Sequence, residues 1–72
     1  MAEEYQVALQ PRGSAQSTLL ATLPSLEIAD RFAHSHAHGK AHVSRLETVG
    51  PGVWRITADG DVYLIVVVAR HT

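Results

Sequence analysis

The chain has 72 residues, of which 46% are apolar and 18% charged, and it contains no cysteine. That length predicts a single domain of residues 1–72, and the lack of cysteine excludes zinc ribbons, thiol catalysis and disulfide frameworks. Six Lys and Arg against seven Asp and Glu give a formal net charge of −1, which argues against both a dedicated DNA-binding protein and an acidic DNA mimic.

The first third of the chain is predicted to form a β-hairpin. Residues 5–10 alternate apolar and polar side chains, which is the period-two pattern of a half-buried strand. Pro11-Arg12-Gly13-Ser14 forms a turn, and the alternation resumes in residues 17–22. We therefore expect two antiparallel strands between residues 4 and 22.

An amphipathic helix is predicted to begin at Pro24-Ser25 and to end at Gly39. Proline is tolerated in a first turn, serine caps free N–H groups, and glycine often follows a last turn. At about 100° per residue, one broad arc holds the apolar positions and His36; its members are Leu26, Ile28, Ala29, Phe32, Ala33, His36 and Ala37. We expect this arc to pack on a sheet, with His36 partly buried and hydrogen-bonded to one backbone group.

Three more strands are predicted after the helix. Residues 42–49 and 53–58 flank the turn at Gly50-Pro51-Gly52, and Asp59-Gly60 is a strong signal for a tight hairpin turn. The apolar run Val62–Ala69 predicts a strand covered on both faces, in the centre of the sheet or in an interface. The predicted fold class is α+β, a mostly antiparallel, curled five-stranded sheet with one helix packed on it, in the order ββαβββ.

The chain carries no pattern that directs it to a membrane. Its acidic start, MAEEYQ, lacks the basic and apolar regions of a signal peptide. The longest apolar run is far below the roughly 20 residues that cross a bilayer. We expect a cytoplasmic protein without a membrane partner.

No arrangement typical of catalysis is found in the sequence. Its serines lack the flanking glycines of a nucleophile elbow, and Gly50-Pro51-Gly52 precedes a strand rather than a helix. The acidic residues are scattered, and a domain of this size has little depth for a substrate pocket. We expect neither an enzyme nor a cofactor.

A histidine cluster favours one alternative function. Asp30, His34 and His38 are spaced four residues apart on the polar side of the helix, and His42 follows. Histidines at i and i+4 supply two zinc ligands in some helices, and a histidine cluster gains charge near pH 6 to 7. A metal-responsive or pH-responsive regulator is therefore an alternative, but a solvated polar helix face is the simpler interpretation, and we assign no metal site.

Nucleic-acid binding is a second alternative. A local positive stripe would consist of Arg31, Lys40, Arg45 and Arg55. Trp54 would stack on a base, but it shares a strand side with Ile56, which favours a core position. Arg45 and Arg55, as cross-strand neighbours, would pair with Glu47 rather than with phosphate. Nucleic acid is therefore not expected to be the main partner.

Several segments resemble one protein family. Ser25–Ala33 (SLEIADRFA), Val43–Val49 (VSRLETV), Trp54 and Asp59-Gly60 are similar to small phage-encoded anti-CRISPR proteins of the type I-F inhibitor group. The resemblance implies a protein that docks on backbone subunits of a crRNA-guided Cas surveillance complex and obstructs target DNA. Only Arg31 matches a basic contact position of that family; Asp30 and Ser35 stand at the neighbouring ones, which dilutes the positive helix face.

The sequence thus predicts a non-enzymatic protein-binding inhibitor or adaptor, of phage or mobile-element type. The partner-binding residues expected are Arg31, His34, His38, Arg45 and Arg55. A helix face with charges of both signs suits a complementary protein surface. One helix covers one face of the strand Val62–Ala69, so its second face requires a barrel, the target or a second copy in a homodimer.

Overall fold

One antiparallel sheet and one helix make up the fold. The computed structural model describes the backbone of residues 2–70 and the side chains of residues 3–68. The elements are β1 (Ala2–Gln10), β2 (Thr18–Leu23), α1 (Leu26–His36), β3 (Glu47–Gly50), β4 (Val53–Ala58) and β5 (Asp61–Arg70). The predicted α+β fold and its order ββαβββ are confirmed. None of the helical segments within residues 2–70 is long and apolar enough to cross a membrane.

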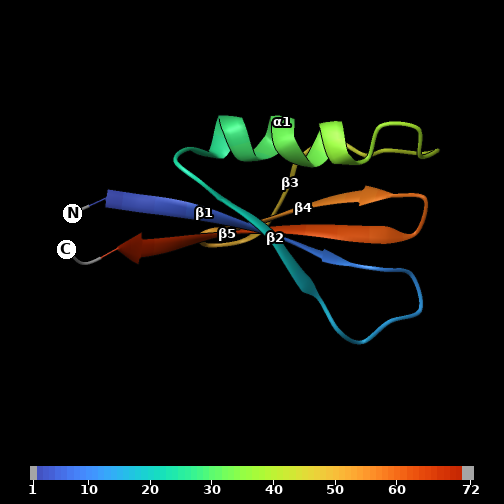
Figure 1. Ribbon diagram of the computed structural model, residues 1–72, viewed down its shortest axis with the longest axis horizontal. Helices are drawn as coiled ribbons and strands as arrows, with labels where there is room; N and C mark the ends of the chain where they lie inside the picture. The colour runs from blue at the N-terminus through green and yellow to red at the C-terminus, as the bar shows by residue number, and fades with distance from the viewer. Residues whose placement is uncertain (1, 71–72) are drawn as a thin grey trace.

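The strand order is β2-β1-β5-β4-β3, and each neighbouring pair is antiparallel. β5 is central, as its apolar run predicted. Because β2 and β3 form two separate edges, the sheet does not close into a barrel. Figure 1 shows α1 on one side of the sheet and no element on the other.

The core lies between α1 and the sheet face that α1 covers. Its fully buried hydrophobic side chains come from the helix and from three strands: Val7, Ala29, Ala33, Ala37, Ile56, Ala58, Tyr63 and Ile65. Trp54 packs against this cluster, with its ring centroid 5.9 Å from that of Tyr5. The interpretation of Trp54 as a core residue is confirmed.

The helix begins where the sequence predicted. The Ser25 side chain caps α1 by accepting a hydrogen bond of 3.2 Å from the Ile28 N–H. Past its last turn, Gly39 has a φ of 92°, a conformation that glycine adopts without steric strain.

The buried stripe of α1 is narrower than the predicted arc. Ala29, Ala33 and Ala37 are fully buried, whereas Ile28 is 43% exposed and His36 is also exposed. The expected burial of Ile28 and His36 was therefore wrong, and the hydrogen-bond partner of His36 is the Tyr63 hydroxyl rather than a backbone group. Small side chains at i, i+4 and i+8 let the helix lie close to the sheet, so only this row is fully buried, while Leu26 and Phe32 pack against the core and stay partly exposed.

The two turns around β4 match their sequence signals. Asp59 and Gly60 have φ values of 54° and 89°, the two positive values that a tight hairpin turn requires. At Gly52, φ is 70°, and a Cβ there would lie 2.7 Å from the Val67 side chain. Gly52 and Gly60 therefore both occupy positions where the backbone conformation favours glycine.

The predicted strand over residues 42–49 was wrong in its first half, because β3 begins at Glu47. His42 has a φ of 55°, which is incompatible with an extended strand. Ser44 is instead fixed to β4: its N–H donates to the Thr57 carbonyl at 2.7 Å, and its hydroxyl accepts from the Thr57 N–H at 2.9 Å. Two hydrogen bonds of Ser44 therefore hold this segment to β4 in place of continuous strand pairing.

Candidate functional site

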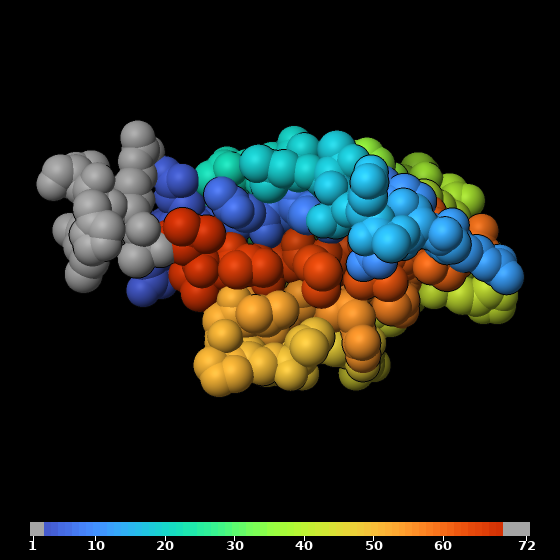
Figure 2. Space-filling view, turned by 90° about the horizontal axis from the view of Figure 1, so that it is seen from below, coloured from blue at the N-terminus to red at the C-terminus, as the bar shows by residue number. Residues whose placement is uncertain are grey.

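The sheet face opposite α1 is the most distinctive surface of the molecule, and we call it the open face. Tyr63 and Ile65 point into the core, so the alternate side chains of β5 point away from α1. Register with the neighbouring strands extends this set to Glu4, Gln6, Ala8, Gln10, Leu19, Thr22, Glu47, Val53, Arg55, Thr57, Val62, Leu64, Val66 and Val68. Figure 2 views the molecule from this side, with β5 across the middle.

An apolar stripe runs along the centre of the open face. Val62, Leu64, Val66 and Val68 follow one another on β5, and Val53 of β4 lies beside Val66. Val66 and Val68 are each 36% exposed, and Leu19 on β2 is 55% exposed. Scattered exposed hydrophobic residues are ordinary, but a contiguous row on an uncovered sheet marks an interaction surface.

Among the described residues, the charged side chains of the open face flank the apolar stripe, and none lies within it. Arg55 and Glu47 are cross-strand neighbours whose Nη2 and Oε2 atoms lie 3.7 Å apart, as the sequence suggested for this pair. Glu4 lies on β1 opposite Val68. The centre of the face is therefore uncharged and selects neither an acidic nor a basic partner.

His34 joins α1 to the loop before β3. Its Nδ1 lies 3.0 Å from the Asp30 carbonyl oxygen and its Nε2 lies 3.1 Å from the Ser44 carbonyl oxygen. Both partners are acceptors, so both contacts are hydrogen bonds only when the ring is protonated and each nitrogen carries a hydrogen. The buried Asp30 Oδ1 lies 2.9 Å from the same Nδ1 and also favours the protonated ring, through its charge and as a further acceptor.

The surroundings of His34 shift its pKa upward. Burial lowers the pKa, but the carbonyl oxygens of Asp30 and Ser44 together with the Asp30 carboxylate raise it by more. A group whose pKa is higher in the folded state stabilises that state at low pH. The contribution is full below the ordinary value of 6.5 and is lost as pH rises through the raised folded value.

We expect His34→Gln to reduce this pH dependence. The variant should lose most stability relative to the natural chain at about pH 5.5 and least at about pH 8.5, because only the natural chain gains from protonation of this ring. Urea unfolding across that range measures the difference. His38→Gln is the matched control, since His38 is exposed and no side-chain contact is described for it. Equal pH slopes for the two variants would contradict the expectation.

A second polar cluster joins the loop after α1 to β5. Lys40 Nζ donates to Asp61 Oδ2 at 2.7 Å and to the Tyr63 hydroxyl at 3.1 Å. Because the ammonium only donates, the Tyr63 O–H is free to donate to His36 Nδ1, 2.8 Å away. Asp61 Oδ1 also accepts from the backbone N–H of Arg12 at 2.7 Å. The cluster thus ties three separate segments together.

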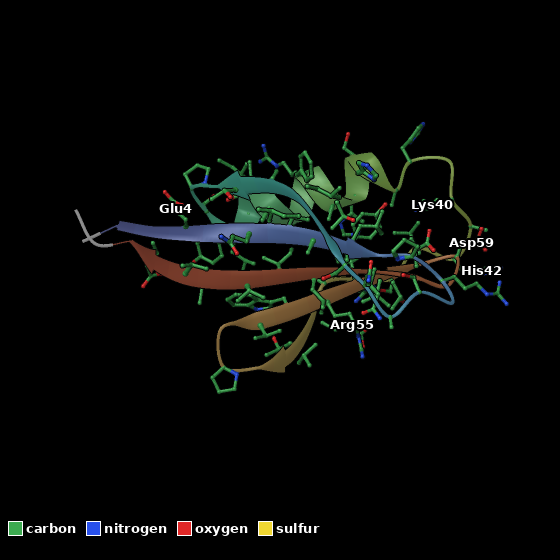
Figure 3. The ribbon with its side chains drawn as sticks, turned by 60° about the horizontal axis from the view of Figure 1, so that its bottom comes forward. Glu4, Lys40, His42, Arg55 and Asp59 are labelled. Atoms are coloured by element: carbon green, nitrogen blue, oxygen red, sulfur yellow. The ribbon has the colours of Figure 1, made fainter. Side chains whose placement is uncertain are left out.

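The electrostatics of this cluster favour a structural role. The hydrogen bond to Asp61 raises the pKa of Lys40. The pKa of Asp61 is lowered, mainly by the hydrogen bond from the Lys40 ammonium and secondarily by that from the Arg12 N–H. Both shifts move the groups away from neutral pH, whereas proton transfer is favoured by pKa values near the working pH. Figure 3 shows Lys40, His42 and Asp59 at the same end of the molecule.

The five predicted partner-binding residues do not share one surface. Arg31, His34 and His38 follow one another along α1 and the turn after it, and Arg45 lies in the loop before β3. Arg55 lies on the open face, on the far side of the sheet (Figure 3). Arg31 is 76% exposed and pairs with Glu27 at 2.8 Å, whereas His34 is used by the fold. The predicted set therefore consists of two separate parts.

The same placement bears on the two alternative functions. Both nitrogens of His34 are already engaged, and among the described residues no group of three or more His, Cys, Asp or Glu side chains is arranged to hold a metal ion. Arg31 and Arg55 are on opposite sides of the molecule, and Lys40 is paired with Asp61. The proposed metal ligands and the proposed positive stripe are thus not assembled within the described part of the chain.

A shallow hollow lies where β1 and β2 meet the start of α1. Its volume is about 260 Å³, and it is lined by Glu3, Glu4, Thr22, Leu23 and Pro24. Cavities that bind small molecules are usually deeper and enclose several hundred cubic ångströms with converging polar groups. The hollow is therefore a weaker candidate for a small-molecule site than the open face is for a protein contact.

Sequence reasoning named Arg55 and the second face of Val62–Ala69, but it missed the other open-face residues and the Lys40 cluster. Gln6, Val53 and Val66 lie on three strands and meet only through sheet register. Lys40 and Tyr63 are 23 residues apart, and the only local signal was a lone tyrosine within an apolar run. Comparison of the chain with family models, with curated proteins and with solved structures gives no match.

Proposed function

We propose that this protein acts by binding protein, as an inhibitor or adaptor without catalysis of its own, and that the open face is its main contact surface. The observation that supports this most is the contiguous apolar row on β5, which α1 leaves uncovered. Because the centre of the open face is uncharged, it favours a partner that also presents an apolar, uncharged patch. A cytoplasmic location is part of the same proposal.

A pull-down with matched variants tests this proposal. Val66→Lys places a charge in the middle of the open face, and Val43→Lys makes the same change in a loop, at 39% exposure against 36% for Val66. Protein retained from a lysate of the source organism by the natural chain and by Val43→Lys should be lost with Val66→Lys. Identical retention by the two variants, measured by quantitative mass spectrometry, would count against the open face.

The finer form of the proposal is inhibition of a crRNA-guided Cas surveillance complex. It is supported by the sequence resemblance and by Arg31, whose side chain is 76% exposed and pairs with Glu27 of its own helix. Excess protein should reduce target DNA binding by a purified type I-F complex at least about tenfold, and Arg31→Glu should weaken this effect, because one contact charge is reversed. A gel shift with no effect from the natural chain would reject the finer form and leave the general one standing.

A further inference from the structure

Every copy of the chain carries an identical open face, so the apolar and uncharged patch that this face requires in a partner is present on a second copy. We propose that a second copy packs on it, sheet against sheet, to form a two-layered β-sandwich with one helix on each outer side. This inference rests on the proposed function, because it names the protein that covers the open face.

The small core is the first argument for a second copy. Of the eight fully buried hydrophobic residues among those described, four are alanine, which contribute little apolar surface. A chain of 72 residues is near the lower limit for a domain held by its own core. Packing two open faces together adds a second apolar layer and stabilises the folded state, with a contribution that grows with the logarithm of the protein concentration.

The area of the open face is the second argument. The strands β1 to β5 contain nine, six, four, six and ten residues, 35 in all. At about 3.3 Å per residue and about 4.8 Å between strands, the sheet covers about 550 Å². Specific interfaces bury from about 600 Å² per partner upward. The flat area is slightly below that value, but two such faces together offer about 1,100 Å², which exceeds the roughly 1,000 Å² of total buried area that a specific interface requires.

The distribution of charge is the third argument. Identical faces meet without repulsion at their centre, where Val66 is flanked by Gln6 and Val53. Relative to Val66, Glu4 lies on one side, opposite Val68 on β1, and Arg55 lies on the other, opposite Leu64 on β4. A two-fold axis that passes near Val66 can exchange these positions and place Arg55 of one copy over Glu4 of the other. The face is therefore compatible with its own copy.

Sedimentation velocity on the full chain tests this inference. The natural chain should sediment with a mass near twice 7.8 kDa, and Val43→Lys should behave in the same way. Val66→Lys should weaken self-association at least tenfold, because it places two ammonium groups in an apolar contact. Circular dichroism shows whether each variant remains folded.

A second measurement on the natural chain applies even if Val66→Lys does not fold. The midpoint of thermal unfolding should rise with protein concentration, since only the folded state dimerises. If the chain sediments with the mass of a single copy at protein concentrations up to on the order of 100 µM, the inference is overturned, because specific complexes have dissociation constants well below that concentration. Equal loss of the dimer in Val43→Lys and Val66→Lys would also overturn it. If the natural chain is monomeric while the pull-down still depends on Val66, the inference fails and the proposed function stands.

Discussion

Ile65→Ala is expected to lower the free energy of unfolding by about 2–5 kcal/mol, which is about half of the stability of the domain. Ile65 is fully buried on the central strand, between Val7 of β1 and Trp54 of β4. A domain of this length has a total stability of about 4–11 kcal/mol, so the cavity left by the lost side chain is a large fraction of it. Thermal unfolding should show a midpoint lower by about 10 °C or more.

The control for this change is Ile28→Ala, which removes the same atoms from a site that is 43% exposed. Much of the Ile28 side chain is already in water, and alanine is the better helix former. We expect a change below about 1 kcal/mol. Similar losses in the two variants would mean that the sheet face under α1 is not the main core.

Ala33→Leu is expected to destabilise the protein by about 1–3 kcal/mol, although leucine is nearly as good a helix former as alanine. Ala33 is fully buried in the row that faces the sheet. Three further carbon atoms there push α1 away from the sheet and separate Ala29 and Ala37 from their contacts. Urea unfolding measures the loss of stability.

Ser35→Leu is the control for Ala33→Leu, because it introduces leucine two residues away at an exposed position of the same helix. Its effect should stay within about 0.5 kcal/mol. If Ala33→Leu were neutral or stabilising, the space between α1 and the sheet would be larger than the burial of the alanine row indicates.

The parts of the fold that the sequence predicted well depend on local chemistry. Asp59-Gly60 and Ser25 act through their own backbone and the next few residues, so a turn and a helix cap follow from the sequence alone. The central position of β5 follows from its long apolar run, since an edge strand of that composition would be exposed on its free side.

The parts that it predicted less well depend on contacts between distant residues. The stretch before Glu47 has the alternation of a strand, but His42 and Ser44 are held by a positive φ and by contacts with Thr57 and His34. The helix was assigned too wide an apolar arc because periodicity does not reveal how close the sheet lies. The burial expected for Ile28 was wrong for this reason.

The candidate site shows the same division. The sequence indicated that the second face of the strand Val62–Ala69 needs a cover, yet it placed the contact residues mainly on the helix. Which side chains share the open face is decided by register between strands that are far apart in the chain, as for Gln6 and Val66. Arg55 belongs to that face through its position on β4, a fact that charge patterning does not reveal.

The pairing of β1 with β5 has a consequence for how the chain folds. These strands run side by side along their whole length, from Ala2 opposite Arg70 to Gln10 opposite Val62. The middle of the sheet therefore forms only after about sixty intervening residues have been brought into a closed loop, which slows folding relative to a chain of local contacts. During synthesis, β1 and β2 emerge first and wait as an isolated hairpin, which is marginally stable in water, until β5 leaves the ribosome. The domain is thus expected to fold late and in one step, with the β4–β5 hairpin as the template on which β1 docks.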